Sequence, residues 1–199
     1  MFGPLSNTIQ GVVSFTWPMV LISTIIIVSF RIAYVLKNHI RFVLYQDLLM
    51  LSFIIYVLCL FQVVTFQDTV SWSSNNFIPF REIFRYDFGS QLFVKNVLGN
   101  MILFLPFGFF ISYYLKSKKV WLPVILTLIA SCSIETVQMV IGRVFDIDDI
   151  ILNLFGGVIG FSIYYLLVKI GRKLPDVLKS DVFLNIISVV LLIGLLTLL

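Results

Sequence analysis

Ionisable and amide side chains gather in one stretch of a very apolar chain, between Ile134 and Gly160. Glu135 interrupts one apolar run, Asn153 interrupts the next, and a charged cluster lies between the two runs. Charged groups at membrane depth are costly and commonly mark functional sites. The cluster consists of Arg143, Asp146, Asp148 and Asp149. We therefore expect the chain to present a polar site at one face of a membrane.

Side chains of these types support three kinds of chemistry. Amides and carboxylates can bind sugars, amides or a peptide, and a pair of carboxyl groups, here Glu135 and Asp149, can act as acid and base on a lipid-linked substrate. Oxygen ligands suit Ca²⁺ or Mg²⁺, and Asp146, Asp148 and Asp149 are the candidates. Their spacing lacks the full EF-hand pattern, so no cofactor is predicted. No Ser–His, Cys–His or HExxH arrangement is present, and whether the chain is an enzyme stays open.

Further polar side chains are spaced so that they share helical faces with this cluster. Residues three or four apart lie on one face of a helix. The pairs are Asn96 with Asn100, Glu135 with Gln138, and Asp149 with Asn153. Each pair can be explained by hydrogen bonds between helices alone. Because exposure to lipid is the costly alternative, we expect the three faces to converge on a pocket that opens outward and has Glu135 at its floor.

The elements that must position these residues are membrane helices. The chain has 199 residues, of which 60% are hydrophobic and 12% charged, whereas soluble domains are about 25% charged. A spanning helix needs about 20 apolar residues. We expect an all-α, polytopic membrane helix bundle with about six spans, forming a single integral-membrane domain over residues 1–199. The expected spans are Val12–Leu36, Phe42–Phe66, Val97–Leu115, Val120–Ile141, Ile150–Val168 and Val182–Leu199.

Two details of these spans remain open at this point. The last run is the shortest, and a chain with five spans, whose last run lies on the membrane surface, is the alternative. The fifth span is expected to begin near Ile150, with Asp148 or Asp149 as its N-cap. Gly156 and Gly160 in that span form a small-xxx-small pair, which is typical of tight packing between membrane helices.

The basic residues predict which way the chain lies in the membrane. Ten of the 14 Lys and Arg residues belong to the first, third and fifth loops, which the positive-inside rule places in the cytoplasm. Both termini and the acidic cluster are then extracytoplasmic. The net charge of +4 is spread over these loops, so the lipid bilayer is the expected partner and nucleic acid is not.

The longest segment outside the expected spans, Gln67–Lys95, alternates aromatic and charged side chains. This pattern predicts a short amphipathic element at the outer interface before the third span. In one interpretation, it is a surface helix that anchors the bundle. In the other, Arg81 and Arg85, which are four residues apart, point from one helical face toward an anion or toward the acidic cluster.

Four ordered blocks of the sequence resemble the VanZ-like family. They are NNFIPFREI (Asn75–Ile83), NVLGNMILFLPFGF (Asn96–Phe109), IETVQ (Ile134–Gln138) and GRVFDIDDIILNLFGGVIG (Gly142–Gly160). The resemblance implies a core at about residues 75–161 in a bacterial plasma-membrane protein. Members of the family are associated with resistance to teicoplanin-type lipoglycopeptides, which act at the outer surface, where the lipid-linked wall precursor also lies. We therefore expect an envelope protein whose polar pocket binds the drug or the precursor, or alternatively an enzyme that modifies an envelope lipid.

Overall fold

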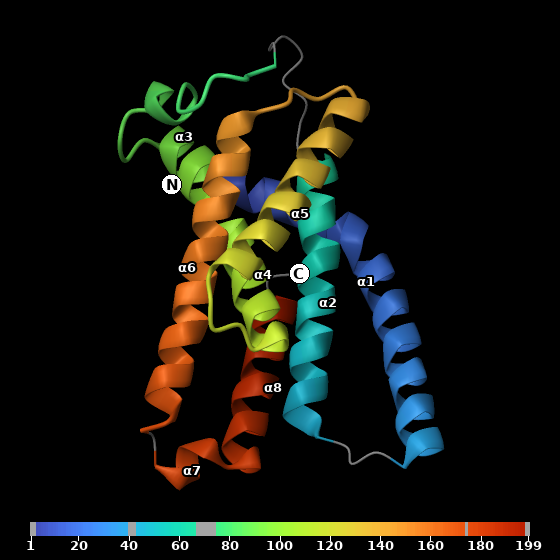
Figure 1. Cartoon of the computed structure of the whole chain (residues 1–199). Coiled ribbons are helices and arrows are strands. Elements are labelled where there is room, and N and C mark those ends of the chain that lie inside the picture. Colours follow the sequence, from blue (N-terminus) through green and yellow to red (C-terminus); the bar gives the residue numbers. More distant parts are fainter. Residues whose placement is uncertain (1–2, 40–42, 67–74, 174, 198–199) are drawn as a thin grey trace. The chain divides into compact units, whose positions relative to one another are not determined.

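The computed structural model describes residues 3–39, 43–66, 75–173 and 175–197 (Figure 1). Over these residues the chain forms helices and their connections without any β-strand, and a single isolated bridge joins Asn76 to Asp146. The all-α prediction is confirmed. The chain divides into two compact units, one made of residues 1–67 and 174–199 and the other of residues 68–173. The single-domain prediction stays a prediction.

Five helices in the described part of the chain are long and apolar enough to cross a membrane, so the chain is a multi-helix membrane protein. The sixth apolar helix, Asp181–Gly194, is shorter, as expected from the sequence. Counts of five and six spans both remain predictions. Some residues of the expected elements lie outside the described residues, namely Phe42, residues 67–74 and residues 198–199. The five helices are Trp17–Asn38, Leu44–Phe61, Gln91–Leu115, Trp121–Val140 and Ile147–Gly171.

The first unit is a packed group of apolar helices around α2. Its helices are α1 (Gly3–Asn38), α2 (Leu44–Phe66), α7 (Asp176–Lys179) and α8 (Asp181–Thr197). Helix α2 contacts both α1 and α8. Arg31 Nε on α1 donates to Asp47 Oδ1 on α2 at 2.6 Å. This ion pair joins α1 to α2 and provides each charge with a partner, as membrane segments require.

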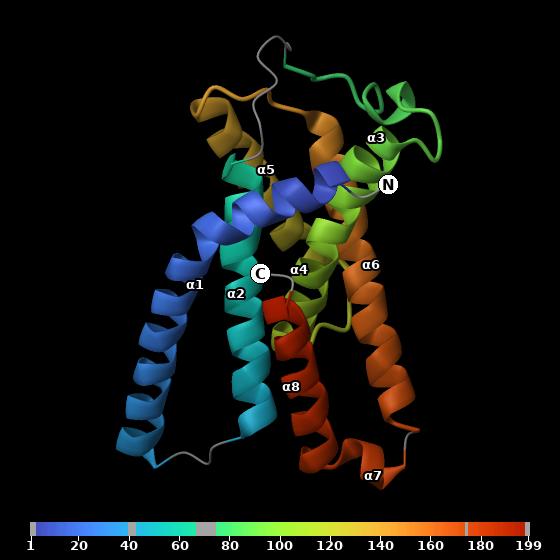
Figure 2. The ribbon, with the colours of Figure 1, turned by 180° about the vertical axis from the view of Figure 1, so that it is seen from behind.

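The second unit contains most of the polar residues singled out from the sequence. It consists of η1 (Ile83–Arg85), α3 (Gln91–Phe93), η2 (Val94–Leu98), α4 (Gly99–Leu115), α5 (Trp121–Val140) and α6 (Ile147–Gly171). The segments α3, η2 and α4 follow one another without a break, and η2 is a single π-helical turn. Helices α4 and α6 lie side by side, and α5 contacts both (Figure 2).

Glycines bring the backbones of α4 and α6 into direct contact. A Cβ atom added to Gly156 would lie 2.1 Å from the carbonyl oxygen of Met101, and one added to Gly160 would lie 2.1 Å from that of Leu105. Gly108 on α4 meets the α6 backbone equally closely. The small-xxx-small pair therefore packs tightly, as predicted.

Helix α6 begins earlier than the sequence predicted. It starts at Ile147 rather than near Ile150, and its N-cap is Asp146 instead of Asp148 or Asp149. Asp146 has extended backbone angles (φ −131°, ψ 116°), and its side chain accepts a hydrogen bond from the Asp148 amide. The physical reason is the bridge to Asn76, which holds Asp146 in the extended conformation that an N-cap requires.

The segment before α3 does not form the helical face expected for Arg81 and Arg85. Only Ile83–Arg85 are helical, as one 3₁₀ turn, and Phe80 adopts a left-handed backbone conformation with φ 65°. The segment, which we call the loop 75–90, runs across the beginning of α6 (Figure 1, green over orange). Because Arg81 lies outside this turn, the four-residue spacing does not place Arg81 and Arg85 on one helical face.

The glycine contact predicts a matched pair of substitutions with opposite outcomes. Gly160→Ala places a methyl group into the backbone of α4 and should lower the stability by about 1–3 kcal/mol, the usual cost of overpacking. Gly171→Ala is the control, because a Cβ atom there meets nothing within 4 Å. Thermal unfolding of the purified protein in detergent measures both. Equal unfolding midpoints for the two variants would show that the helix contact is looser than described.

Candidate functional site at the start of α6

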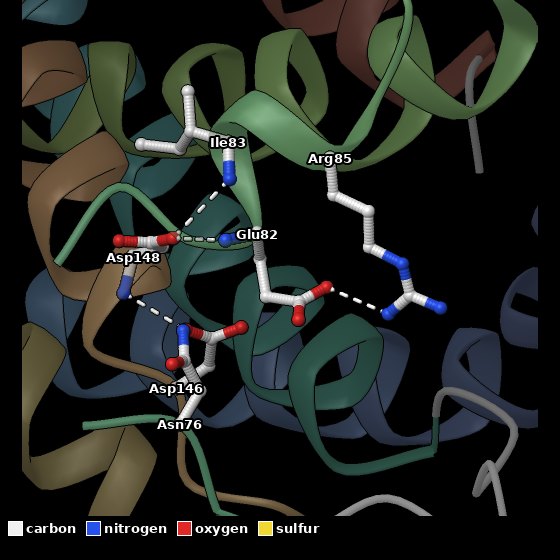
Figure 3. A network of polar contacts seen from close by, with 6 residues as sticks. All are labelled: Asn76, Glu82, Ile83, Arg85, Asp146 and Asp148. Atoms are coloured by element: carbon white, nitrogen blue, oxygen red, sulfur yellow. Dashed lines mark hydrogen bonds and ion pairs between the residues drawn. The ribbon is translucent and has the colours of Figure 1, made fainter. Parts of the chain in front are cut away.

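The carboxylate of Asp148 fastens the loop 75–90 to α6. Its Oδ1 accepts a hydrogen bond from the Phe80 amide at 2.5 Å, and its Oδ2 accepts from the amides of Glu82 at 2.7 Å and Ile83 at 3.2 Å. Figure 3 shows the two bonds to Oδ2. Asp148 is 1% exposed. Hydrogen bonds to a charged group contribute about 1.5–3 kcal/mol each, so this one side chain determines the path of the loop.

A second connection joins the beginning of the loop to the turn before α6. The Asn76 amide donates to the Phe145 carbonyl at 2.8 Å, and the Ile147 amide donates to the Asn76 carbonyl at 3.0 Å. The side-chain amide of Asn76 also donates to Asp146 Oδ1 at 2.8 Å. Asn75 Oδ1 accepts from the Phe145 amide at 3.0 Å. Two consecutive asparagines thus complete the hydrogen bonding of a short parallel bridge.

Glu135 connects α5 to the same turn. It is 1% exposed, and its Oε2 accepts a hydrogen bond from the Asp146 amide at 3.0 Å. Gln138, three residues later, is also buried. Helix α5 ends directly afterwards, where the Arg143 amide donates to the Gln138 carbonyl across Gly142, whose φ is 83°. This end is a Schellman arrangement, in which glycine adopts the left-handed conformation at low cost.

The three predicted polar faces meet one another. The side-chain amide of Asn100 on α4 donates to Asp149 Oδ1 on α6, and that of Asn153 on α6 donates to Ser131 Oγ on α5 at 2.9 Å. Glu135 lies four residues after Ser131 and hence on the same face of α5. We call this set the polar layer. Its members are Asn100, Ser131, Glu135, Gln138, Asp149 and Asn153.

Charge within the polar layer is mostly acidic. The carboxyl groups of Glu135 and Asp149 interact electrostatically with each other, and Arg143 interacts with both. Asp146 lies beside them in the turn, where burial raises the pKa of its carboxyl group. Hydrogen bonds from the Asp148 amide and from Asn76 oppose this rise. Arg143 is therefore a positive charge that interacts with the two carboxyl groups of the polar layer.

Asn96 and Tyr86 extend the polar contacts toward the loop. The Tyr86 side chain is hydrogen-bonded to Asn96, and it interacts electrostatically with Asp149. Burial raises the pKa of the Tyr86 phenol, and the bond with Asn96 opposes that rise. The predicted pair Asn96 and Asn100 thus has two different partners, one on the loop and one on α6.

The two predicted arginines of the loop lie apart from these contacts. Arg85 Nη1 donates to Glu82 Oε2 at 3.0 Å, in an exposed pair within one turn. Figure 3 shows the Arg85 side chain directed toward Glu82 and away from Asp146 and Asp148. Arg81 is exposed as well. The structure thus brings together the predicted site residues on α4, α5, α6 and the turn before α6, and it leaves Arg81 and Arg85 outside this group.

Sequence reasoning missed three contributors to this arrangement. Asn76 and Tyr86 belong to the segment that the sequence predicts as an amphipathic element, and Ser131 belongs to the fourth expected span, without a predicted role. The signal that points to Asn76 is its place in the block NNFIPFREI, three residues before Pro79. Tyr86 and Ser131 carry no comparable signal, because both lie outside the four blocks of the resemblance.

The geometry of the carboxylates bears on the predicted cation site. Within the described ranges, no group of three or more His, Cys, Asp or Glu side chains is arranged to hold a metal ion. Asp146 and Asp148 direct their carboxylates at N–H groups of the protein. A Ca²⁺ or Mg²⁺ site at Asp146, Asp148 and Asp149 stays a prediction.

We expect Asp148→Asn to release the loop 75–90. Asparagine retains one acceptor oxygen and turns an NH₂ group toward backbone N–H donors. The free energy of opening the loop should therefore fall by about 2 kcal/mol, which corresponds to roughly thirtyfold faster amide exchange. Hydrogen exchange at the amides of Phe80, Glu82 and Ile83 measures it. Asp87→Asn, an exposed position on the same loop, is the matched control. Unchanged exchange in Asp148→Asn would show that other contacts hold the loop.

Comparison with known proteins assigns the chain to a family. The VanZ/LLP1 family model matches residues 53–168, which is more than half of the 199 residues and includes the loop 75–90 and the polar layer. Protein VanZ of Enterococcus faecium is 31% identical over 102 residues, covering 50% of this chain and 62% of that protein. The chain thus spans less than two thirds of the length of that relative. No solved structure matches significantly. The chain belongs to the VanZ/LLP1 family.

Proposed function

We propose that the chain is a bacterial plasma-membrane protein of the cell envelope that supports resistance to teicoplanin-type lipoglycopeptides. The polar layer binds the drug or a lipid-linked wall precursor at the outer leaflet. Family membership and the similarity to Protein VanZ support the envelope role. The excess of basic residues in the odd loops supports placing the acidic cluster and both termini outside the cytoplasm.

One observation carries the proposal: carboxyl and amide groups from three apolar helices meet inside the unit. Helix packing does not need them, because the glycine contact already holds α4 against α6. Buried ionisable groups within membrane helices are costly and mark functional positions. Glu135, Asp149 and Asn153 together offer acceptors and donors of the kind that sugar hydroxyl and peptide amide groups bind.

Access to the polar layer involves the loop 75–90. Asp148 and Glu135 are each 1% exposed, so the carboxylates lie within the protein when the loop is fastened. We propose that the loop opens by exchanging its three hydrogen bonds to Asp148 for bonds to water or ligand. A fastened loop keeps the layer closed in the absence of ligand, and a ligand that bonds to the layer shifts the equilibrium to the open form.

The binding role predicts loss of protection when the layer is altered. We expect Glu135→Gln, Asp149→Asn and Arg143→Ala each to abolish teicoplanin protection in a susceptible host. The first two remove a carboxyl group from the polar layer, and the third removes the positive charge that interacts with both carboxyl groups. The measurement is the inhibitory concentration of teicoplanin, with membrane abundance determined in parallel. Asp87→Asn serves as the control and should protect like the parent. If all three variants protect like the parent at equal abundance, the polar layer is not the binding site.

A second candidate function is a membrane-embedded enzyme that modifies a lipid or a lipid-linked envelope intermediate. The observation that favours it is the electrostatic interaction between Glu135 and Asp149, which lie on different helices. Two carboxyl groups that interact in this way can hold different protonation states, as an acid and a base require. Asn100 donates a hydrogen bond to Asp149 and would then orient the Asp149 carboxyl group.

The enzymatic alternative predicts a new lipid or precursor species in cells that overproduce the protein. Mass spectrometry of extracted lipids and wall precursors should show this species with the parent. It should disappear in the Glu135→Gln, Asp149→Asn double variant at equal membrane abundance. A profile that is the same for the parent, the double variant and the empty host counts against catalysis and leaves the binding function standing.

A further inference from the structure

The loop 75–90 carries a concentrated set of exposed aromatic side chains, which we call the aromatic face. It consists of Phe77, Phe80, Phe84 and Phe88, and all four are exposed. We infer that the aromatic face docks into the lipid surface of the membrane, at the boundary between headgroups and acyl chains. This inference concerns the placement of the loop and does not depend on the proposed ligand.

The exposure of these rings is unusually high for phenylalanine. Phe84 is 82% exposed and Phe88 is 92% exposed. Single exposed apolar residues need no explanation, but a contiguous patch marks an interaction surface. The rings also contact other aromatic rings: Phe80 lies 6.2 Å from Phe84, and Phe88 lies 5.1 Å from Phe93, measured between centroids. Phe77 stacks on Phe145, with 5.2 Å between ring centroids. Within the face, Phe80 and Phe84 therefore contact each other, and Phe77 and Phe88 lie near them along the chain.

The loop cannot readily refold to bury these rings within the protein. Asp148 holds the amides of Phe80, Glu82 and Ile83 from the inner side. Phe80 is held with φ 65°, a conformation that bulky residues rarely adopt. Turning the aromatic face inward would break these three hydrogen bonds. The contacts that fix the backbone of the loop thus leave the four rings exposed.

Continuity with a membrane helix identifies lipid as the partner. Phe88 lies three residues before Gln91, where a helix long and apolar enough to span a membrane begins. Exposed apolar side chains continue along that helix at Leu92, Val94 and Ile102. Since the start of a span lies at the membrane boundary, the aromatic face that precedes it lies at the same depth.

The charges around the face fit the same environment. Arg81, between Phe80 and Phe84, and Lys95, which follows the face along the chain, are both exposed, and their long side chains can reach lipid phosphate groups. Arg85 is paired with Glu82 in the same turn. Apolar rings beside basic side chains are the composition of segments that lie in a membrane interface.

Site-directed spin labelling of the full-length protein tests the inference. Cys59 and Cys132, which are free, are replaced by Ala, and a nitroxide is attached at Phe84→Cys or Phe88→Cys. Asp87→Cys, between the two, is the matched control. The proteins are reconstituted in vesicles of phosphatidylcholine with phosphatidylglycerol. The ratio of nitroxide accessibility to oxygen over that to a water-soluble nickel chelate should be several-fold higher at positions 84 and 88 than at position 87.

Two outcomes would overturn the inference. Ratios at positions 84 and 88 that are as low as those of a label in water would place the aromatic face in water. Low accessibility to both reagents at positions 84 and 88 would show that protein, such as a second copy of the chain, covers the face. Each labelled variant must keep the parent's thermal unfolding midpoint in detergent, which these exposed positions should allow.

Discussion

Helix α6 starts with backbone N–H groups that no residue of the helix itself can satisfy, and the surrounding unit supplies their partners. The first four amides of any helix lack intrahelical acceptors, and unmet polar groups in an apolar medium cost several kcal/mol each. The Asn76 carbonyl accepts from Ile147, and the Asp146 carboxylate accepts from Asp148. The position of Asn76 beside the turn and the start of α6 at Ile147 both follow from meeting this requirement.

The acidic residues consequently divide into two functional groups. Asp146 caps the helix and Asp148 fastens the loop, so both carboxylates are used in holding the fold. Glu135 and Asp149 instead belong to the polar layer, together with amide side chains of three helices. Aspartates that are neighbours in the sequence thus have different roles, because their carboxyl groups have different hydrogen-bond partners. The proposed binding and the proposed catalysis both rest on the second group.

Close helix packing is what allows the short side chains of the polar layer to meet. Asn100 reaches Asp149 because Gly156 and Gly160 let α6 approach the backbone of α4. Small residues drive association of membrane helices for this reason, since lipid offers no hydrophobic force between them. The polar layer therefore depends on the apolar glycine contact, although the two lie on different residues.

Composition and spacing were sufficient to predict much of this protein. Long apolar runs predict helices that can cross a membrane, because each needs about 20 apolar residues. The three- and four-residue spacings predicted which polar side chains share a face, and Glu135 and Asn153 indeed face the interior. These predictions succeed because they depend on local helix geometry, which the sequence determines directly.

Tertiary contacts decided the remaining features. The capping role of Asp146, the three amides held by Asp148 and the irregular path of the loop 75–90 all depend on partners about 65–70 residues away. The amphipathic pattern of the loop predicted a helix, but the carboxylate of Asp148 selects a different backbone, with Phe80 left-handed. Periodicity cannot reveal such a choice, because bonds to a buried charge outweigh the local preference of a short segment.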